Sequence, residues 1–564
     1  MSRGDEADAG STGRRGRVDR VVVAVAVIAL AALAARLLFL GARPFHWGEG
    51  RVGYWTLRFL ETGAWEYRPV AGGPFLYVVG RWWLSVAPPT DAAARVPVAV
   101  VGGLLPLAAL LFRGTLRDDE TVALAGVLAA DPLLLYYSRF LRGDVPAAAF
   151  GLVAVGGVVR FRDTGSRPAL YLAAASFALA LSASGFAVAY PFVWLAAALL
   201  VVDEARVRGA PREALSTVGA AGGWLVDRVT PLARSLFVFL AVVVVFFAPR
   251  AASGGVGLNR PATIPTAVVR ALVASPKKFA QVHVAFRLDP GAPAGPAFIP
   301  VVAGYASTLV HTAWPMLVAA LVGFALERYR RDTRSVVAFG GYAAGVGLLV
   351  FPLSSMRAEP WTAVHVLPWL ALPAAVGVAR LARGVRGYVA RGLTGADTAV
   401  NPARVVAALL VVSAVGAGVG TAVAGAYAPA QPGSPFAQFA QPSDDLDPML
   451  DAAEPVIAAN VDGADVAYVG DRFDTEREYA QPPIPSRDQK AWGARLPLQW
   501  YFERADADVT SVPSVTFIPG DAPPVVVTTP ERRVAVHEAL PEYRQFDLHL
   551  GLWDRKVVVF VAPQ

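Results

Sequence analysis

Residues 43–95 read RPFHWGEGRVGYWTLRFLETGAWEYRPVAGGPFLYVVGRWWLSVAPPTDAAAR and begin just after an apolar run at 21–40. As a helix, an apolar run of this length can cross the roughly 30 Å of hydrocarbon in a bilayer. Tryptophan, tyrosine and arginine are frequent at the boundary between lipid and water. The sequence therefore predicts a membrane helix followed by a long polar loop, 41–94, whose side chains lie at the level of the lipid head groups.

The composition extends this prediction to most of the chain. Of the 564 residues 55% are hydrophobic, and the mean hydropathy is +0.46. Further apolar runs follow the first one, so we expect a polytopic α-helical membrane protein with about eleven transmembrane helices. The predicted spans are 21–40, 95–112, 120–137, 145–160, 168–184, 186–202, 231–248, 299–323, 335–353, 361–383 and 403–426.

The distribution of arginine predicts the orientation. Residues 1–20 hold little to bury and are expected to form a disordered cytoplasmic tail. With this tail inside, the arginine-rich loops alternate with poorer ones all along the chain, as the positive-inside rule requires. The first loop, the loop at 138–144 and everything after 427 are then extracytoplasmic. The basic front of the first run resembles a signal peptide, but its length and the later spans favour an uncleaved anchor.

The C-terminal part has a different character from the membrane part, 21–426. Residues 441–564 include 21 acidic and 11 basic residues, whereas residues 1–440 include 23 acidic and 40 basic ones. A Pro-rich linker is predicted at 427–446, followed by an extracytoplasmic α/β domain at 447–564. We expect its helices at 447–460 and 531–540, and its strands at 465–470, 498–503, 508–512, 523–529 and as a pair within 543–562.

Several chemistries are excluded by what the chain lacks. There is no cysteine, so disulfides, thiolate catalysis and zinc–thiolate sites are excluded. No phosphate-binding glycine loop, dinucleotide fingerprint or His-Glu-x-x-His motif occurs, so ATP-driven transport and zinc proteolysis have no support. The basic residues lie in short loops between spans, which argues against a nucleic-acid partner.

The first candidate motif is in the first loop, where His46, Glu49 and Arg51 follow one another closely. A carboxylate just outside a membrane span is suited to act as a general base toward an acceptor hydroxyl, or to position a phosphate-linked donor. The plainer interpretation of Glu49 is an ordinary solvated loop residue.

Two further motifs lie in predicted outer loops. Arg139 and Arg142 suit a lipid phosphate, because guanidinium groups bind phosphate through paired hydrogen bonds. Asp144 opens the next span, where a helix N-cap is the plainer interpretation. Arg357 is a further phosphate candidate, and His365 is an ionisable residue within a predicted span and hence a functional candidate. The plainer interpretation of His365 is a packed, neutral imidazole.

Three segments carry a resemblance to a known family: HWGEGRVGYWTLRFLETGAWEYRP at 46–69, LLYYSRFLRGDV at 134–145 and AWGARLPLQWYFERADADVTSV at 491–512. The chain resembles the flippase-activity-associated membrane proteins of haloarchaea, which are related to dolichyl-phosphate-mannose–protein mannosyltransferases. The resemblance implies a GT-C architecture, with many spans, an acidic motif in the first outer loop and an outer C-terminal domain. It also implies a polyprenyl-phosphate sugar as donor.

The chain departs from this family at three polar positions. Relatives carry an Asp-Glu pair where this chain has Gly48 and Glu49, and a His where it has Gly72. A Lys-Glu pair is expected near Ser184, and neither charge is present.

The leading hypothesis is an inverting GT-C glycosyltransferase that moves a sugar from a polyprenyl (dolichyl) phosphate to a glycan or protein acceptor outside the membrane. Glu49 and Asp144 are the predicted catalytic residues, and no metal ligands are assigned, although a divalent metal is left open. The predicted partners are membrane lipid, the lipid-linked sugar, the acceptor and a flippase. The predicted substrate-binding residues are His46, Arg51, Arg139, Arg142, Arg357 and His365.

The alternative is a catalytically impaired relative that binds lipid-linked glycan or assists a flippase, which the three departures favour. A secondary transporter ranks last, because the sequence shows no inverted internal repeat.

Overall fold

The structure is a computed structural model, and not all of the chain is described. Residues 1–18 of the predicted tail at 1–20, Gly72 and Arg357 lie outside the described residues. The described residues are 19–67, 73–208, 223, 227–251, 254–274, 276–277, 298–330, 333–353, 359–393, 402–428, 431, 433–438, 441–442, 445–475, 487–518, 522–551 and 555–564.

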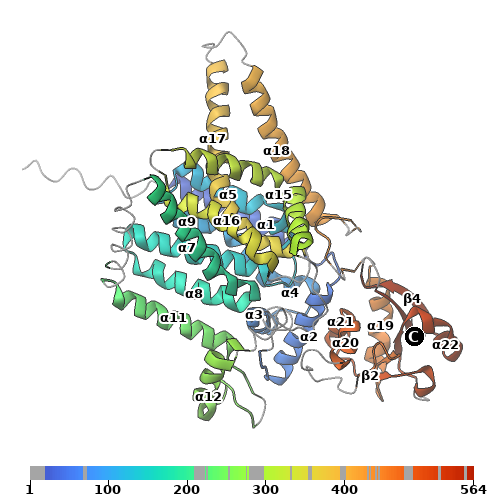
Figure 1. The fold of residues 1–564 in the computed structure, drawn as a ribbon. Coiled ribbons are helices and arrows are strands. Elements are labelled where there is room, and N and C mark those ends of the chain that lie inside the picture. The colour runs from blue at the N-terminus through green and yellow to red at the C-terminus, as the bar shows by residue number, and fades with distance from the viewer. Residues whose placement is uncertain are drawn as a thin grey trace, which may run out of the picture.

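Each of the predicted membrane spans coincides with a helix or a pair of consecutive helices (Figure 1). Within the described residues, seven helices are long and apolar enough to cross a membrane. The bundle consists of α1 (Arg20–Leu37), α4 (Asp91–Leu104) with η1 (Leu105–Phe112), α5 (Asp118–Ala130), α6 (Pro132–Tyr137), α7 (Asp144–Thr164), α8 (Arg167–Ala183), η2 (Gly185–Ala189), α9 (Tyr190–Arg208), α11 (Val229–Phe247), α15 (Phe298–Arg328), α16 (Ser335–Leu353), η6 (Pro360–His365), α17 (Leu367–Leu393) and α18 (Pro402–Tyr427). Beside α11 lie η3 (Pro261–Thr263), α12 (Ile264–Val269) and η4 (Arg270–Ala274).

The predicted span at 120–137 consists of two helices, with the break at Asp131 and Pro132. Helix α5 ends at Ala130 and α6 begins at Pro132, because proline has no N–H to continue the helical ladder. The side chain of Asp131 caps the new helix by accepting a hydrogen bond from the N–H of Leu134 at 2.9 Å. The short helix α6 then turns the chain into the segment 138–143, which leads to α7.

The first loop is folded into two helices, α2 (Trp47–Thr62) and α3 (Pro74–Leu84). The start of α2 is a capping box, in which the N–H of Gly48 donates to Nδ1 of His46 and the N–H of His46 donates to Glu49. Helix α2 ends at Gly63, whose φ of 64° is favourable for glycine.

The C-terminal domain contains a five-stranded sheet in the order β2-β1-β3-β5-β4. Its central strands β1 and β3 are parallel and almost wholly buried, and β5 lies antiparallel to β3 and β4. The strands are β1 (Val466–Val469), β2 (Val509–Val512), β3 (Val525–Thr528), β4 (Arg544–His549) and β5 (Lys556–Val561). The helices are α19 (Asp447–Ala459), α20 (Arg487–Ala494), α21 (Leu498–Arg504), η7 (Val515–Phe517), η8 (Pro530–Arg532) and α22 (Arg533–Ala539).

The strand predicted at 498–503 is wrong, because this segment is the helix α21. The alternation of Leu498, Trp500 and Phe502 suggested a strand with one buried face, but Gln499 and Tyr501 between them are also buried. Trp500 and Tyr501 bind the same carboxylate, that of Asp91. Neighbouring residues of an extended strand point to opposite faces and could not do so.

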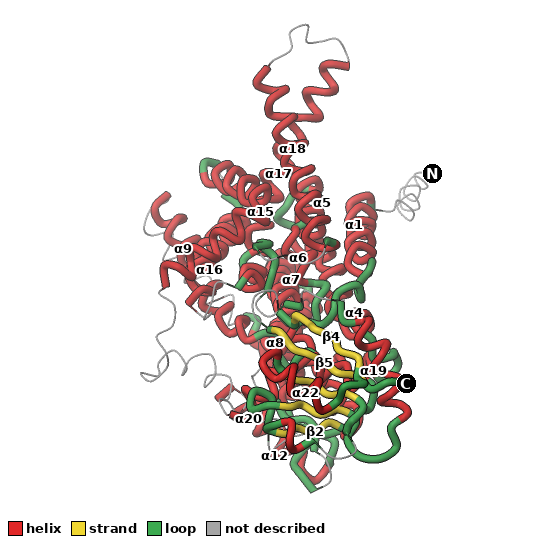
Figure 2. Tube along the Cα trace, turned by 90° about the vertical axis from the view of Figure 1, so that its right-hand side faces the viewer, coloured by secondary structure: helices red, strands yellow, loops and turns green. Residues whose placement is uncertain are grey.

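Helix α21 docks the C-terminal domain on the first loop. The ring of Trp500 stacks on Phe45 with centroids 4.8 Å apart, and the hydroxyl of Tyr501 accepts a hydrogen bond from the N–H of Phe45 at 2.8 Å. Asp91 at the start of α4 accepts from Trp500 Nε1 at 2.8 Å and from the Tyr501 hydroxyl at 2.7 Å. Figure 1 shows the domain beside the first loop, and both views show it away from the far ends of α17 and α18 (Figures 1 and 2).

This packing predicts that Gly53→Ala weakens the contact between α2 and α21. A Cβ at Gly53 would lie 2.6 Å from Cε3 of the buried Trp500, so α21 has to move although alanine favours the helix. We expect about 1–3 kcal/mol of weaker docking, and faster hydrogen–deuterium exchange of the backbone amides at 498–504. Gly126→Ala is the matched control, because a Cβ there meets no atom within 4 Å. Unchanged exchange in Gly53→Ala would contradict this packing.

Candidate functional site

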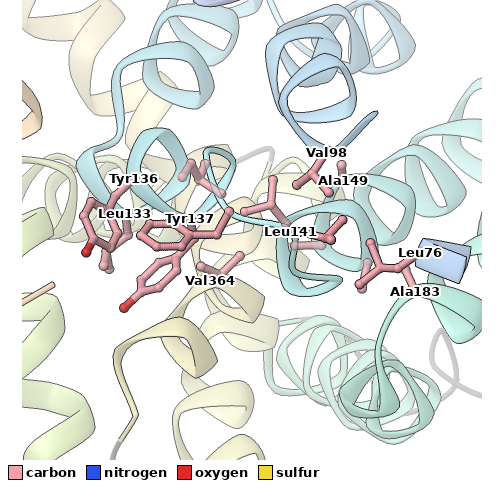
Figure 3. Close-up of a cluster of buried hydrophobic side chains, with 14 of the residues drawn as sticks. Leu76, Val98, Leu133, Tyr136, Tyr137, Leu141, Ala149, Ala183 and Val364 are labelled. Carbon is pink, nitrogen blue, oxygen red and sulfur yellow. The ribbon is translucent and has the colours of Figure 1, made fainter. Parts of the chain in front are cut away.

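The candidate site lies where the first loop, the segment 138–143 and η6 meet. A core of buried side chains from several elements, including Leu76, Val98, Tyr137 and Val364, supports this end of the bundle (Figure 3). The approach of α7 to α8 is so close that a Cβ at Gly143 would lie 1.8 Å from the carbonyl oxygen of Ala183. The same carbonyl accepts a hydrogen bond from the N–H of Gly73, which brings the start of α3 to this point.

Asp144 is the central carboxylate of the site. Its Oδ2 accepts a hydrogen bond from Nε of Arg142 at 3.1 Å, and its Oδ1 lies 3.3 Å from both Nε2 of His365 and Oγ of Ser184. The N-cap interpretation of Asp144 is wrong, because Gly143 holds the N-cap position and the Asp144 side chain makes these tertiary contacts instead. The structure thus brings three of the predicted site residues together.

His365 connects Asp144 to a tyrosine. Its imidazole is fully buried, and its Nδ1 lies 2.6 Å from the hydroxyl of Tyr190. With Asp144 ionised, Nε2 of His365 carries the proton and Nδ1 accepts from the tyrosine hydroxyl. The resulting chain, Tyr190 to His365 to Asp144, is an ordered route of hydrogen bonds that ends at the carboxylate. Tyr190 gave no signal in the sequence, since it is a single tyrosine at the start of an apolar run.

Arg142 lies between Asp144 and the first loop. Its Nη1 donates to Oε1 of Gln438 at 3.2 Å, and its guanidinium lies 4.0 Å from the ring centre of Trp361. The side chain keeps 16% of its surface exposed. A Cβ at Gly48 would lie 3.8 Å from Nη1 of Arg142, so the backbone of the first loop borders this guanidinium. Of the predicted phosphate ligands that the structure describes, Arg142 keeps an exposed guanidinium surface that can bind a phosphate.

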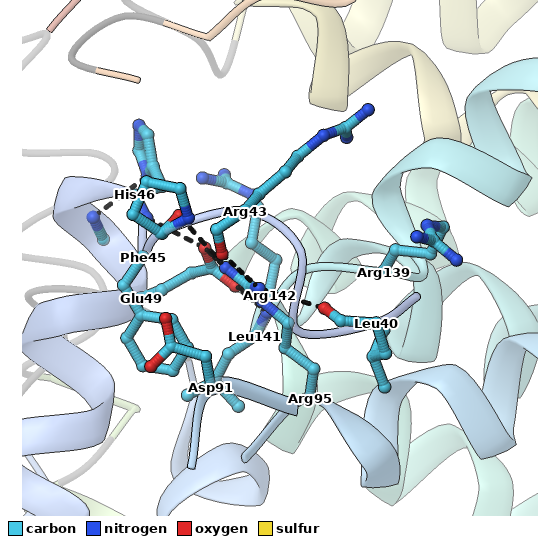
Figure 4. A network of polar contacts seen from close by, with 12 residues as sticks. Leu40, Arg43, Phe45, His46, Glu49, Asp91, Arg95, Arg139, Leu141 and Arg142 are labelled. Carbon is cyan, nitrogen blue, oxygen red and sulfur yellow. Dashed lines mark hydrogen bonds and ion pairs between the residues drawn. The ribbon is translucent and has the colours of Figure 1, made fainter. Parts of the chain in front are cut away.

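Glu49 is enclosed, so its interpretation as a solvated loop residue is wrong. The side chain is 0% exposed and accepts four hydrogen bonds (Figure 4). Nε and Nη2 of Arg95 donate at 2.8 and 2.9 Å, and the backbone N–H groups of His46 and Leu141 donate at 2.9 and 2.6 Å. Burial alone would raise the pKa of Glu49, but the charge and hydrogen bonds of Arg95 outweigh it, and the pKa lies below its usual value. No oxygen is left for an acceptor hydroxyl.

Like Glu49, the other predicted site residues that the structure describes are buried among structural contacts. Arg139 donates to the backbone carbonyls of Ala35, Arg36, Leu38 and Phe39 at the end of α1, so it caps that helix. His46 caps α2. Arg51 is buried, with Trp492 of α20 and Tyr77 of α3 as its neighbours.

A metal centre does not fit the described site. Among the described residues, no three His, Asp or Glu side chains come together as ligands. Asp144 already binds Arg142, whose positive charge beside the carboxylate disfavours a divalent cation.

The enclosure of Glu49 predicts a large loss of stability in Glu49→Gln. The change leaves Arg95 buried without its counter-charge, which costs about 3–5 kcal/mol. We expect a clearly lower midpoint of thermal unfolding, followed by tryptophan fluorescence in detergent. Glu61→Gln on the same helix is the control, because the side chain of Glu61 is 60% exposed and its ion pair with Arg58 contributes little. Equal midpoints for the two variants would refute this role of Glu49.

The fold is similar to that of solved membrane glycosyltransferase structures. ArnT from Cupriavidus metallidurans bound to undecaprenyl phosphate matches with a TM-score of 0.58 at 16% identity, over 96% of this chain and 99% of that one. The apo oligosaccharyltransferase of Archaeoglobus fulgidus matches with a TM-score of 0.53 at 15% identity, over 94% of this chain and 69% of that one. The same enzyme, AglB, in complex with an inhibitory peptide and a dolichol-phosphate gives 0.52 at 15%, over 93% and 72%.

In sequence, residues 446–562 match the family described as the Agl23 flippase-associated protein C-terminal domain. No curated protein is similar to the chain in sequence. These findings agree with the resemblance seen in the sequence: the C-terminal domain matches the Agl23 flippase-associated family model, and it is joined to a multi-pass membrane domain whose fold is like that of ArnT and AglB.

Proposed function

We propose that the protein is a GT-C-type glycosyltransferase that moves a sugar from a polyprenyl phosphate to a glycan or protein acceptor on the outer face of the membrane. The observation that carries this proposal is the placement of Asp144 between Arg142 and the buried pair of His365 and Tyr190. A carboxylate beside a partly exposed guanidinium suits a reaction that needs a base and a phosphate ligand. The ligands named for ArnT and AglB, undecaprenyl phosphate and dolichol-phosphate, support the class of donor.

The proposed reaction is a single displacement. An acceptor oxygen attacks the anomeric carbon of the sugar, and its bond to the phosphate oxygen breaks. The phosphate leaves with the electron pair and is stabilised by Arg142, while the proton of the acceptor hydroxyl passes to Asp144. His365 orients the carboxylate through its Nε2–H, and Tyr190 fixes the tautomer of His365. Attack from the side opposite to the phosphate inverts the configuration at the anomeric carbon.

Glu49 acts in this proposal as a positioning residue. Its bond to the N–H of Leu141 holds the segment that carries Arg142, and its ion pair with Arg95 holds the first loop on the bundle. We place both the first loop and the C-terminal domain outside the membrane, on the grounds of the arginine distribution. The docking of α21 on this loop requires only that the two lie on the same side.

A transfer assay tests the proposal. Purified protein is incubated with a labelled polyprenyl-phosphate sugar and candidate acceptors, and the loss of label from the lipid is measured. Since general-base catalysis contributes roughly 10²–10⁴-fold, Asp144→Asn is expected to lower the rate by about 100-fold or more. Asp462→Asn, an exposed position in the C-terminal domain, is the control and is expected to transfer normally. No transfer from any donor, or full transfer by Asp144→Asn, would overturn the proposal.

A second candidate is a relative without transferase activity that binds lipid-linked glycan or assists a flippase. The observation that favours it is that Gly48 and the enclosed Glu49 leave α2 without an exposed carboxylate where it borders Arg142. If this second candidate is correct, cells without the protein have a changed amount of lipid-linked glycan on the outer leaflet, while sugar transfer in their extracts is normal.

The variant Gly48→Asp distinguishes the two candidates. It places a carboxylate in the first turn of α2, a favourable position for a negative charge, beside His46 and Arg142. If the wild-type protein is a transferase with a weakened site, Gly48→Asp raises the rate of transfer and Gly48→Asn does not. A rate of zero for wild type and for both variants would favour the second candidate.

A further inference from the structure

One face of α2 points away from the site described above and carries aromatic side chains around an arginine. Trp47, Arg51 and Trp55 are four residues apart, so they lie along one side of the helix. Trp492 of α20 packs on this side. The guanidinium of Arg51 lies 5.8 Å from the ring centre of Trp47 and 5.6 Å from that of Trp492, and the rings of Trp55 and Trp492 are 5.8 Å apart. These four residues form the indole–arginine cluster.

The cluster holds buried hydrogen-bond donors that have no acceptor. Nε and Nη2 of Arg51, Nε1 of Trp55 and Nε1 of Trp492 are all buried, and none has a partner within the described part of the chain. Arg51 is 1% exposed, and the neighbour that acts on its charge is the hydroxyl of Tyr77 and not a described carboxylate. Burial without a counter-charge lowers the pKa of Arg51 to about 10. Buried donors are nearly always paired, so a group of four unpaired donors points to a ligand with several acceptors.

The free edge of Arg51 matches a carboxylate. Arg95 uses the same two nitrogens, Nε and Nη2, to hold the carboxylate of Glu49 at 2.8 and 2.9 Å. Parallel hydrogen bonds from one edge of a guanidinium to the two oxygens of a carboxylate are the usual paired geometry. Arg51 presents this edge without an occupant from the described residues.

The surroundings favour a negatively charged ligand with an apolar ring face. Trp47 and Trp55 are half-buried and flank Arg51, and Trp47 is fixed by its Nε1–H, which donates to the carbonyl of Gly493 at 2.7 Å. The same carbonyl accepts from Nη2 of Arg555, a second guanidinium, whose Nη1 is buried and has no partner among the described residues. Indole rings pack on the C–H faces of a pyranose, and their free N–H groups can donate to its oxygens.

We propose that the indole–arginine cluster binds a carboxylate-bearing sugar, with the carboxylate on Nε and Nη2 of Arg51 and the pyranose ring against the indoles. The first residue of the cluster, Trp47, is next to Gly48 in the chain, so we assign the sugar to the glycan that the protein handles. The proposal rests on the proposed function only where it assigns the sugar to that glycan. Equilibrium binding of the sugar requires neither a donor lipid nor transfer.

The test is a titration of the full-length protein in detergent with glucuronate, followed by tryptophan fluorescence, with glucose and inorganic phosphate in parallel. Glucuronate is expected to give a saturable change, and glucose is expected to bind more than about tenfold more weakly, because it lacks the charged acceptor. Arg51→Met is expected to abolish the response to glucuronate. Arg544→Met is the matched control, because Arg544 also lies over an aromatic ring, that of Phe546 at 4.7 Å, but at an exposed position.

A second measurement separates ligand binding from a structural role of Arg51. Without ligand, Arg51→Met removes an unpaired buried charge, so its midpoint of thermal unfolding is expected to equal or exceed that of wild type. A lower midpoint, or a glucuronate response that survives in Arg51→Met, overturns the proposal. Tighter binding of phosphate than of glucuronate identifies the ligand as a phosphate and also overturns it. If the protein transfers sugar but does not bind glucuronate, only this proposal fails. If it binds glucuronate but does not transfer sugar, only the proposed function fails.

Discussion

The ion pair between Glu49 and Arg95 is the interaction on which the geometry of this protein depends. Two charges buried this deeply cost several kcal/mol each to remove from water, and only close contact with further hydrogen bonds repays that cost. Here the carboxylate receives four donors, and Nη1 of Arg95 donates to the carbonyls of Leu40 and Arg43 as well. The pair therefore ties the end of the first span, the start of α2, α4 and the segment after α6 to one point. Gly48 and Arg142 are neighbours as a consequence.

The arginines at this end of the molecule divide into those that hold the fold and those that are free to bind. The guanidinium of Arg95 is engaged with a carboxylate, and both Nη groups of Arg139 are engaged with the carbonyls at the end of α1. Arg142 keeps part of its surface exposed beside Asp144, and Arg51 keeps one whole edge without an acceptor among the described residues. Since each guanidinium has a fixed number of donors, the nitrogens that are already engaged cannot also hold a phosphate or a sugar acid. The hydrogen-bond partners of each guanidinium therefore distinguish arginines that look alike in the sequence.

The helices could be predicted from the sequence because long apolar runs have only one stable form in a bilayer. The proximity of Arg142, Asp144 and His365 could be predicted in part, because all three were candidates near the outer ends of predicted membrane spans. The role of Glu49 could not be predicted, because its partner Arg95 is 46 positions away and was counted as the start of a span. Tyr190 and Gln438 were missed for the same reason: their contacts join segments far apart in the chain. In α21, tertiary packing on both sides of a short segment imitated the alternation of a strand.

Helix α2 links the two sides of the protein, because its faces are assigned to different partners. Glu49 faces the bundle, Gly50 and Gly53 face Pro497 and Trp500, and Arg51 faces Trp492. A helix transmits position along its length as a rigid body, so the register that Glu49 sets at its start also sets where Arg51 meets the C-terminal domain. Conversely, the aromatic contacts of α20 and α21 hold α2 against the bundle at the turn that borders Arg142. The C-terminal domain is therefore part of the site's construction: without it, the first loop would keep the ion pair but lose the surface that fixes the rest of α2.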